Sequence, residues 1–341
     1  MASIVEVARR AGVSITTASR VINNSSHPVS AATRARVLKV MEELNFRPSA
    51  LARAMITKRT QIIGVIVGDS SDPYFSVIIR GIEDVARKRG YLVIICNSER
   101  DPEVEYNYLS LMRDYHVDGL IFAGGSRQDE TALRRVISAL EELHSTGVAI
   151  VALNPHLFPA PQVSIDNVAA AREMTEHLLA LGHRRIAYID GPAEITTSAL
   201  RRRGYREALE AARLPPDPAL IWPGDYTFES GLSTADRFIA SNPRPTAIFA
   251  SNDQMAIGAI TSLRRLGITV PNDVSVAGLD DIPSARYIEP PLTTIEVPLH
   301  QLGAYGMQTI LCILSGESVE SFYLSHTLIV RRSTAPPATE S

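Results

Sequence analysis

Apolar positions near the start of the chain recur at helical spacing in two short neighbouring segments. The first begins at a potential capping residue, Ser3, and its apolar face consists of Ile4, Val7, Ala8 and Ala11. Gly12 then stands where a helix commonly ends in the left-handed conformation, and Ser14 can cap a second helix. The inward face of that helix consists of Ala18, Val21 and Ile22. The pattern predicts a helix-turn-helix whose second helix enters the major groove of DNA.

The alternative to this prediction is an ordinary pair of helices with a solvated surface. The outward face of the second helix favours the DNA-binding interpretation. The face is small and hydroxylated, where a solvated helix would commonly carry Glu and Lys. Ile15 is also exposed at the helix start, where an apolar side chain can contact a thymine methyl group. Both features favour close approach to DNA.

A third helix is expected from a cap at Ser30 to about Leu44, with a buried stripe that consists of Val37, Leu38, Val40, Met41 and Leu44. Beyond it, Pro48 fits the first turn of a helix, and residues 50–55 favour helix by composition. This piece is too short to be stable in isolation. We therefore expect a linker helix that forms when DNA and a second subunit hold it.

From Ile62 the pattern changes to strands that alternate with amphipathic helices. The expected strands are 62–67, 91–96, 119–123, 149–153, 186–189, 247–250 and 274–278, and the clearest helices are 75–89, 168–181, 199–212 and 254–266. Repeated strand–helix units predict a doubly wound parallel sheet, and the length suffices for two such lobes. Ligands in this class bind beyond the carboxyl ends of strands, here the loops after Val67, Leu153, Ile189, Ala250 and Gly278.

Several of these loops are rich in polar and aromatic side chains. They include residues 69–75, Asn154, residues 251–253 and residues 280–281. Carboxylates and amides that pair with hydroxyl groups, beside aromatic faces, suit a sugar or a nucleoside-like ligand. For Asn252 and Asp253 the alternative is that they only cap the helix that follows.

Composition and charge support a DNA-binding head on a larger body. Residues 1–60 carry ten Lys/Arg against three Glu, a net charge of +7, which leaves 24 basic and 34 acidic residues elsewhere. No apolar run is long enough to span a membrane, and the N-terminus lacks a hydrophobic signal region, so we expect a cytoplasmic protein. Cys96 and Cys312 lie far apart, so neither a disulfide framework nor a metal site is expected. The tail 333–341 is rich in Pro, Ala and Thr, which predicts disorder.

Two groups of motifs closely resemble the lac/gal repressor (LacI/GalR) family of transcription repressors. One spans residues 5–14 (VEVARRAGVS), 17–23 (TASRVIN) and 29–37, and the other spans 251–258 (SNDQMAIG) and 270–281 (VPNDVSVAGLDD). The resemblance implies a homodimer on pseudo-palindromic operator DNA, associated with the nucleoid. It implies no cofactor and no metal. The implied domains are a helix-turn-helix domain at 1–46, a hinge helix and linker at 47–60, and an effector-binding and dimerisation domain of two lobes like a periplasmic binding protein at 61–332, followed by the tail.

The family motif also assigns residues on the DNA side. Ile15, Thr16 and Arg20 fall at base-reading positions, and the positions that contact the DNA backbone are Ser14, Thr17, Ser19, Asn23 and Thr33. The hinge and minor-groove positions are Ser49, Ala50, Arg53 and Met55. Met55 stands where the family usually inserts a leucine, and the loop before Val29 is one residue longer than is common.

On the effector side, the matching positions are Tyr74, Phe75, Asn154, Thr197, Arg201, Tyr226, Asn252, Asp253 and Asp280. Arg201 and Asp280 resemble the family pair that grips ligand hydroxyls or a polar ring edge. Purine-binding relatives have an arginine where this chain has Ile195, which disfavours a purine. The resemblance therefore favours a sugar or another small polyol.

Two other classes of function were compared with a ligand-regulated repressor. A solute-binding protein of a transport system would share the fold of residues 62–332, but it would need a signal peptide and would not need residues 1–60. An enzyme on a doubly wound sheet is disfavoured because the chain lacks a G-x-S-x-G elbow, a P-loop and a G-x-G-x-x-G turn after a strand. The expected effector control of operator affinity is an allosteric coupling.

Overall fold

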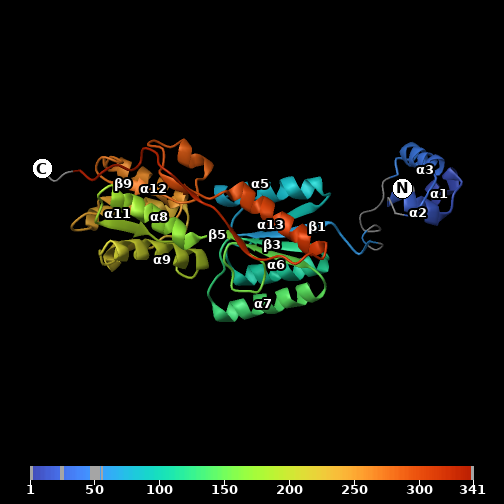
Figure 1. Ribbon diagram of the computed structural model, residues 1–341, viewed down its shortest axis with the longest axis horizontal. Helices are drawn as coiled ribbons and strands as arrows, with labels where there is room; N and C mark the ends of the chain where they lie inside the picture. Colours follow the sequence, from blue (N-terminus) through green and yellow to red (C-terminus); the bar gives the residue numbers. More distant parts are fainter. Residues whose placement is uncertain (1–2, 24–26, 47–53, 55–56, 339–341) are drawn as a thin grey trace. The chain divides into compact units, whose positions relative to one another are not determined.

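The computed structural model describes residues 3–23, 27–46, 54 and 57–338. These residues divide into two compact units (Figure 1). One unit comprises residues 1–61 with 116–118, and the other comprises the rest of the chain. The predicted hinge and minor-groove residues Ser49, Ala50, Arg53 and Met55 lie outside the described residues.

The smaller unit contains the predicted helices α1 (Ile4–Ala11), α2 (Ile15–Ile22) and α3 (Ala31–Glu43). Each begins at the serine expected to cap it, because the hydroxyl oxygens of Ser3, Ser14 and Ser30 accept backbone hydrogen bonds from the third residue beyond. The helices enclose a core that consists of Val7, Ala11, Val21, Val37 and Val40. The expected burial of Leu38 is wrong, since its side chain is 48% exposed on the outer face of α3.

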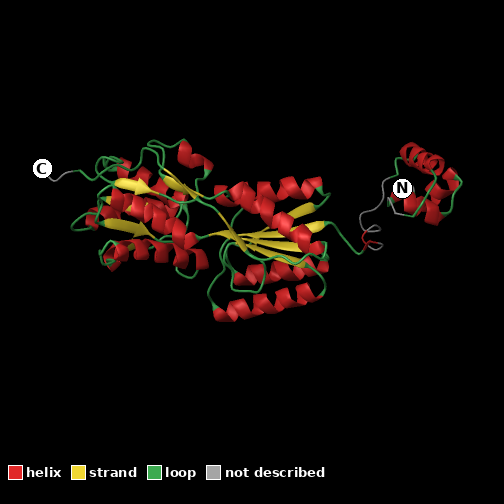
Figure 2. Ribbon diagram, viewed as in Figure 1, coloured by secondary structure: helices red, strands yellow, loops and turns green. Residues whose placement is uncertain are grey.

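The larger unit is built on two four-stranded parallel sheets with helices on both faces (Figure 2). The first sheet has the order β2-β1-β3-β4, with β1 (Ile62–Val67), β2 (Leu92–Asn97), β3 (Gly119–Ala123) and β4 (Ala149–Leu153). The second has the order β7-β6-β8-β9, with β6 (Ile186–Ile189), β7 (Ile221–Trp222), β8 (Ala247–Ala250) and β9 (Ser275–Ala277). This is the expected pair of doubly wound lobes.

The helices of the first lobe are α5 (Pro73–Lys88), α6 (Pro102–Asp114), α7 (Glu130–Ser145) and α13 (Leu299–Leu314). Helices α5 and α13 pack together on one face of its sheet, and α6 and α7 lie on the other (Figure 1). The second lobe carries α8 (Asn167–Ala180), α9 (Thr196–Ala211), α10 (Phe228–Leu232), α11 (Thr234–Ala240) and α12 (Asp253–Arg265), with short 3-10 turns at Pro218–Leu220 and Pro283–Arg286.

Glycines bring two of these helix pairs into backbone contact. A Cβ atom on Gly81 of α5 would collide with the carbonyl oxygen of His300, and one on Gly303 of α13 would collide with that of Ile78. Gly204 of α9 faces the carbonyl oxygen of Val168 on α8 in the same way. The spacing between the helices in each pair is therefore set by backbone atoms.

The chain passes between the lobes at 165–167, 296–299 and 324–327, where short strands pair on either side of each passage. Strand β5 (Val163–Ile165) pairs in parallel with β11 (Phe322–Leu324), and β10 (Thr294–Glu296) pairs antiparallel with β12 (Thr327–Ile329). Sequence analysis did not predict these strands of three residues.

The prediction of a disordered tail is wrong for residues 333–338. Ser333 is fully buried, donates a hydrogen bond to the carbonyl of Val276 at 2.6 Å and accepts one from the amide of Thr293 at 2.8 Å. The backbone amide of Ala335 donates to Ser275 Oγ at 3.0 Å. The segment lacks the bulky apolar residues of an ordinary strand, yet it is held by polar contacts along β9. Residues 339–341 lie outside the described part.

No helix in the described ranges has the length and apolar character needed to cross a membrane.

Candidate functional site

The predicted reading helix, α2, presents the expected side chains on its outer face. Ile15 is 50% exposed, Thr16 is exposed, and Arg20 is partly exposed one turn further along. Within the described ranges, no side chain or backbone group hydrogen-bonds or ion-pairs with the Arg20 guanidinium. Its fork of donors therefore has the geometry required for bidentate contact with an acceptor pair such as guanine O6 and N7.

The predicted backbone-contact residues surround this reading face. Ser14 and Thr17 pair through their hydroxyls at 2.9 Å, and Asn23 Nδ2 donates to Ser19 Oγ at 3.1 Å. Thr33, at the start of α3, accepts a hydrogen bond from the Ser30 hydroxyl at 2.9 Å. Hydroxyl and side-chain amide groups suit phosphate oxygens, and contacts to phosphates fix register without reading sequence.

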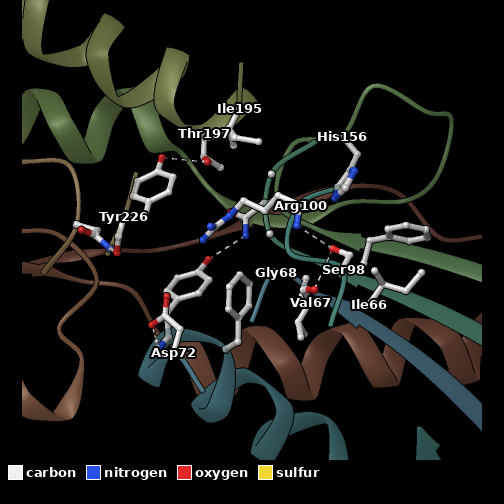
Figure 3. A pocket seen from close by; sticks show the side chains of 18 of the residues that line it. Ile66, Val67, Gly68, Asp72, Ser98, Arg100, His156, Ile195, Thr197 and Tyr226 are labelled. Atoms are coloured by element: carbon white, nitrogen blue, oxygen red, sulfur yellow. Dashed lines mark hydrogen bonds between the residues drawn. The ribbon is translucent and has the colours of Figure 1, made fainter. Parts of the chain in front are cut away.

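The larger unit contains a cavity between its two lobes (Figure 3). Eight of the nine predicted effector residues line it: Tyr74, Phe75, Asn154, Thr197, Arg201, Tyr226, Asn252 and Asp280. They come from the start of α5, the ends of β4 and β9, the start of α9, the loop after β7 and the start of α12. The strand-end rule predicted five of these residues, from both lobes: Tyr74, Phe75, Asn154, Asn252 and Asp280. The family motif supplied Thr197, Arg201 and Tyr226.

Arg201 is the centre of the polar wall. Its Nη2 donates to Asp280 Oδ1 at 2.9 Å, its Nη1 to the carbonyl of Ser251 at 2.6 Å, and its Nε to Asn167 Oδ1 at 3.0 Å. Both members of the Arg201–Asp280 pair are almost fully buried. Burial raises the pKa of Asp280 to about 7, and the Arg201 charge opposes that rise. The pair is thus fixed in place with part of its hydrogen-bonding capacity facing the cavity.

Tyr226 forms the aromatic wall of the second lobe. Its hydroxyl lies 2.8 Å from Ser198 Oγ and 3.4 Å from Thr197 Oγ1. Its backbone adopts a left-handed φ of 73°, and its carbonyl accepts a hydrogen bond from Asn252 Nδ2 at 2.9 Å. Asn252 also caps α12 through the amide of Met255, so this residue has both the capping and the cavity-lining role.

The first lobe contributes Tyr74, Phe75 and Asn154. Asn154 Nδ2 donates to the Tyr74 hydroxyl at 2.9 Å, and the rings of Tyr74 and Phe75 meet edge to face at 5.1 Å. Asn154 is buried with a φ of 130°, an uncommon conformation for a residue other than glycine. Strained backbone of this kind often occurs at ligand sites.

The assignment of Asp253 to the effector site is not supported, because its side chain does not line the cavity. Its carboxyl group is fully buried, where it accepts hydrogen bonds from Thr294 Oγ1 at 2.6 Å and from the amide of Ile282 at 2.9 Å. Burial raises its pKa to about 8. Asp253 therefore positions the loop that carries Asp280, while its own carboxyl group lies outside the ligand space.

Sequence analysis missed several other cavity residues. Ser98, Arg100 and Glu105 follow β2, Phe122 lies within β3, and His156 follows β4. Burial raises the pKa of Glu105 to about 7 and lowers that of His156 to about 4. The signal was available, since the rule used for the other strand ends applies equally to residues after Asn97 and Ala123.

No group of three or more His, Cys, Asp or Glu side chains in the described ranges is arranged to hold a metal ion. The cavity instead combines aromatic faces, hydroxyls, amides and paired charges, which is the composition of a site for a polar organic ligand.

Comparisons with known proteins agree with both halves of this arrangement. Residues 3–49 match the family model for bacterial regulatory proteins of the lacI family, and residues 175–334 match that for a periplasmic binding protein-like domain. The chain is 38% identical to the HTH-type transcriptional regulator DegA of Bacillus subtilis (strain 168), over 98% of each chain.

Two solved structures extend the comparison to three dimensions. The lac repressor dimer bound to operator and the anti-inducer ONPF is 29% identical with a TM-score of 0.85, covering 98% of this chain and 99% of that one. The complex of the transcriptional regulator CelR with cellobiose is 31% identical with a TM-score of 0.72, covering 98% and 100%.

Proposed function

Since the chain belongs to the lacI family of bacterial regulatory proteins, we propose that it is a repressor whose operator affinity is set by a sugar-like effector. Its relatives are DNA-binding transcriptional regulators, and the chain is one of these and not an enzyme. The repressor acts as a homodimer on the nucleoid, in the cytoplasm. Each copy reads one half of a pseudo-palindromic operator.

The observation that carries the effector proposal is the buried Arg201–Asp280 pair at the centre of the interlobe cavity. A buried ion pair whose remaining hydrogen-bonding groups face a cavity suits neighbouring ligand hydroxyls, which can both donate and accept. The adjacent Tyr226 ring supplies an apolar face for the C–H side of a sugar ring. The related CelR structure holds cellobiose, a sugar.

Ile195 supports a sugar over a purine. It is 2% exposed at the cavity wall, and its branched aliphatic side chain has no donor for a purine nitrogen or carbonyl. An effector recognised here therefore has to be held by the hydroxyl-binding groups around Arg201.

On the DNA side we propose that Ile15, Thr16 and Arg20 read bases. Ser14, Thr17, Ser19, Asn23 and Thr33 hold the phosphate backbone, and the hinge residues Ser49, Ala50, Arg53 and Met55 act at the minor groove. Effector binding between the lobes then alters the operator affinity of the dimer, a coupling of about 1–3 kcal/mol in typical allosteric proteins.

The DNA-binding part is tested by selecting operator sites from a random pool with the full-length protein, and then measuring fluorescence anisotropy. Arg20→Ala should reduce discrimination by about 1–3 kcal/mol, because it removes one bidentate base contact per half-site. Arg36→Ala is the matched control, since it removes the same charge from the exposed face of α3. Unchanged discrimination in Arg20→Ala would contradict the assignment of the reading helix. Failure to select any sequence would favour the alternative of a solute-binding protein.

The effector part is tested by thermal unfolding of the full-length protein with a panel of sugars, because a ligand that binds the folded state raises the unfolding temperature. Asp280→Asn should abolish the shift caused by any active sugar, while Asp236→Asn, on the exposed face of α11, should keep it. Retained selective DNA binding by Asp280→Asn shows that the variant is folded. A sugar shift unaltered by Asp280→Asn would place the ligand elsewhere.

A further inference from the structure

Arg100 reaches into the effector cavity from a loop with an unusual backbone. The loop follows β2, and both Glu99 and Arg100 have left-handed φ values, 52° and 58°. Side chains other than glycine adopt this conformation rarely, and two in succession need external support. The amide of Glu99 donates to the carbonyl of Gly68 at 2.8 Å, and that of Arg100 donates to Ser98 Oγ at 3.3 Å. The strained loop is thus tied to the end of β1, and it directs Arg100 into the cavity (Figure 3).

The guanidinium of Arg100 ends against the second lobe without a charged partner. It lies over the ring of Tyr226, 5.6 Å from the ring centre. Within the described ranges, its side chain makes no hydrogen bond and no carboxylate oxygen approaches it within 4.0 Å. An arginine fork in a cavity with its donors unused is a ready receptor for a carboxylate or a phosphate.

Three acidic residues lie close enough to Arg100 to interact with its charge, and each is engaged by other groups. Asp69 accepts hydrogen bonds from the amide and the hydroxyl of Ser71. Asp72 accepts a hydrogen bond from the amide of Tyr74, at the start of α5. Asp225 accepts from the amide and hydroxyl of Thr227. These carboxylates attract the guanidinium and repel an anion beside it, but in the described ranges none of them forms an ion pair with it, so its hydrogen bonds are left to a ligand.

The remaining charges of the cavity do not oppose an anion near Arg100. Arg201 is neutralised by Asp280. Glu105 accepts a hydrogen bond from Ser98 Oγ, and burial makes its neutral form accessible near neutral pH. On the opposite wall, Thr197 lies in the first turn of α9, whose N-terminus has no side-chain cap. The partial positive charge of that helix start adds to the field of Arg100.

We propose that Arg100 determines effector specificity by selecting sugars that carry an acidic substituent, a phosphate or a carboxylate. This inference rests on the proposed function, because it uses the same cavity. The sugar ring lies against Tyr226 and the Arg201–Asp280 pair, and its acidic substituent accepts a bidentate hydrogen bond from the Arg100 guanidinium. The ligand then replaces the contact between Arg100 and Tyr226 and links the two lobes through a charge-assisted bond.

The experiment compares neutral sugars with their acidic counterparts on the full-length protein by titration calorimetry. The probes are glucose, galactose and fructose, each with its sugar phosphate, together with glucuronate and galacturonate. Inorganic phosphate and acetate at the same concentrations measure binding of the bare anion. We expect at least one acidic sugar to bind about 10-fold or more tightly than its neutral parent, as a charged hydrogen bond implies. Whether phosphates or carboxylates show the gain identifies the substituent.

Two variants assign that gain to Arg100. Arg100→Gln should reduce the affinity of the preferred acidic sugar to that of its parent, and leave the parent within about 2-fold, since it removes only the charge-assisted bond. Arg100→Lys should retain part of the preference because it keeps the charge but loses the fork. Arg87→Gln is the control, an exposed arginine on α5 that is paired with Asp84.

The outcomes separate the two proposals. If neutral sugars bind as tightly as their acidic counterparts, or if Arg100→Gln keeps the acidic preference, the role of Arg100 is refuted and the sugar effector stands. If bare phosphate or acetate binds as tightly as the acidic sugar, specificity for a sugar acid is refuted. If no sugar of either kind binds, the sugar effector and the role of Arg100 are both refuted. The assignment of the reading helix is unaffected, because the DNA experiment tests it separately.

Discussion

Glu105 offers a direct test of the cavity's electrostatics in the absence of any ligand. Its carboxyl group sits on α6, accepts a hydrogen bond from Ser98 Oγ at 3.3 Å and has no cationic partner within ion-pair distance in the described ranges. Burial raises its pKa from 4.5 to about 7. Ionising this carboxyl in the folded protein therefore costs more free energy than ionising it in the unfolded chain.

The size and sign of the effect follow from that rise in pKa. Each pKa unit corresponds to about 1.4 kcal/mol, so a folded-state value near 7 corresponds to about 3 kcal/mol of stability. Because the folded pKa is raised, this contribution is fully present below about pH 4.5 and is lost as the pH rises through about 7. Glu105→Gln cannot ionise and can still accept the Ser98 hydrogen bond. The variant should match the wild type at low pH and be more stable at high pH.

The assay is thermal unfolding of the unliganded, full-length protein at a fixed concentration across about pH 4.5 to 8.5. For a domain of this size, 3 kcal/mol corresponds to roughly 6–12 °C. The difference in unfolding temperature between Glu105→Gln and the wild type should thus increase from near zero at the lowest pH to roughly that value at the highest. Glu141→Gln, on the exposed face of α7, controls for the loss of a negative charge. A gap that stays constant with pH, or that equals the gap of the control, would refute the reasoning.

Three further changes test other parts of the structure. Gly204→Ala should destabilise the large unit by about 1–3 kcal/mol in urea unfolding, since its methyl group meets the carbonyl of Val168; unaltered stability would contradict the close helix contact. Truncation after Arg332 should cost about 1–3 kcal/mol in the same assay because it removes buried hydrogen bonds, and unaltered stability would contradict the contacts of Ser333. Asp253→Ala should lower stability by about 1–3 kcal/mol because the amide of Ile282 and the hydroxyl of Thr294 lose their acceptor, and calorimetry should detect little change in sugar affinity once the variant is folded.

The buried strands were the most predictable part of the fold. Strands β1, β3, β4, β6 and β8 begin and end at the predicted residues, because a parallel strand covered on both faces is a continuous apolar run bounded by polar or glycine residues. Strands β2 and β9 differ from the prediction by one residue at each end. The short strands near the lobe passages were missed since three residues carry no measurable periodicity.

The effector site was predictable in its centre and less so at its margins. Asn252 and Asp253 adjoin in sequence, yet only the first faces the cavity, because the start of α12 turns successive side chains in different directions. Arg100 was missed because the strand-end rule was not applied to the residues after β2. That rule would have placed Arg100 near the site, but the left-handed backbone that directs its side chain follows from no residue pattern.

The glycine contacts between α5 and α13, and between α8 and α9, also bear on how such a molecule can acquire new ligands. At Gly81, Gly204 and Gly303 any larger residue meets backbone atoms that cannot rotate away, so the architecture of each lobe tolerates almost no variation there. The cavity walls are built differently, from side chains at strand ends and helix starts that can be exchanged without moving a helix. Evolution can therefore change which ligand the regulator binds while the packing of the helices in each lobe stays the same.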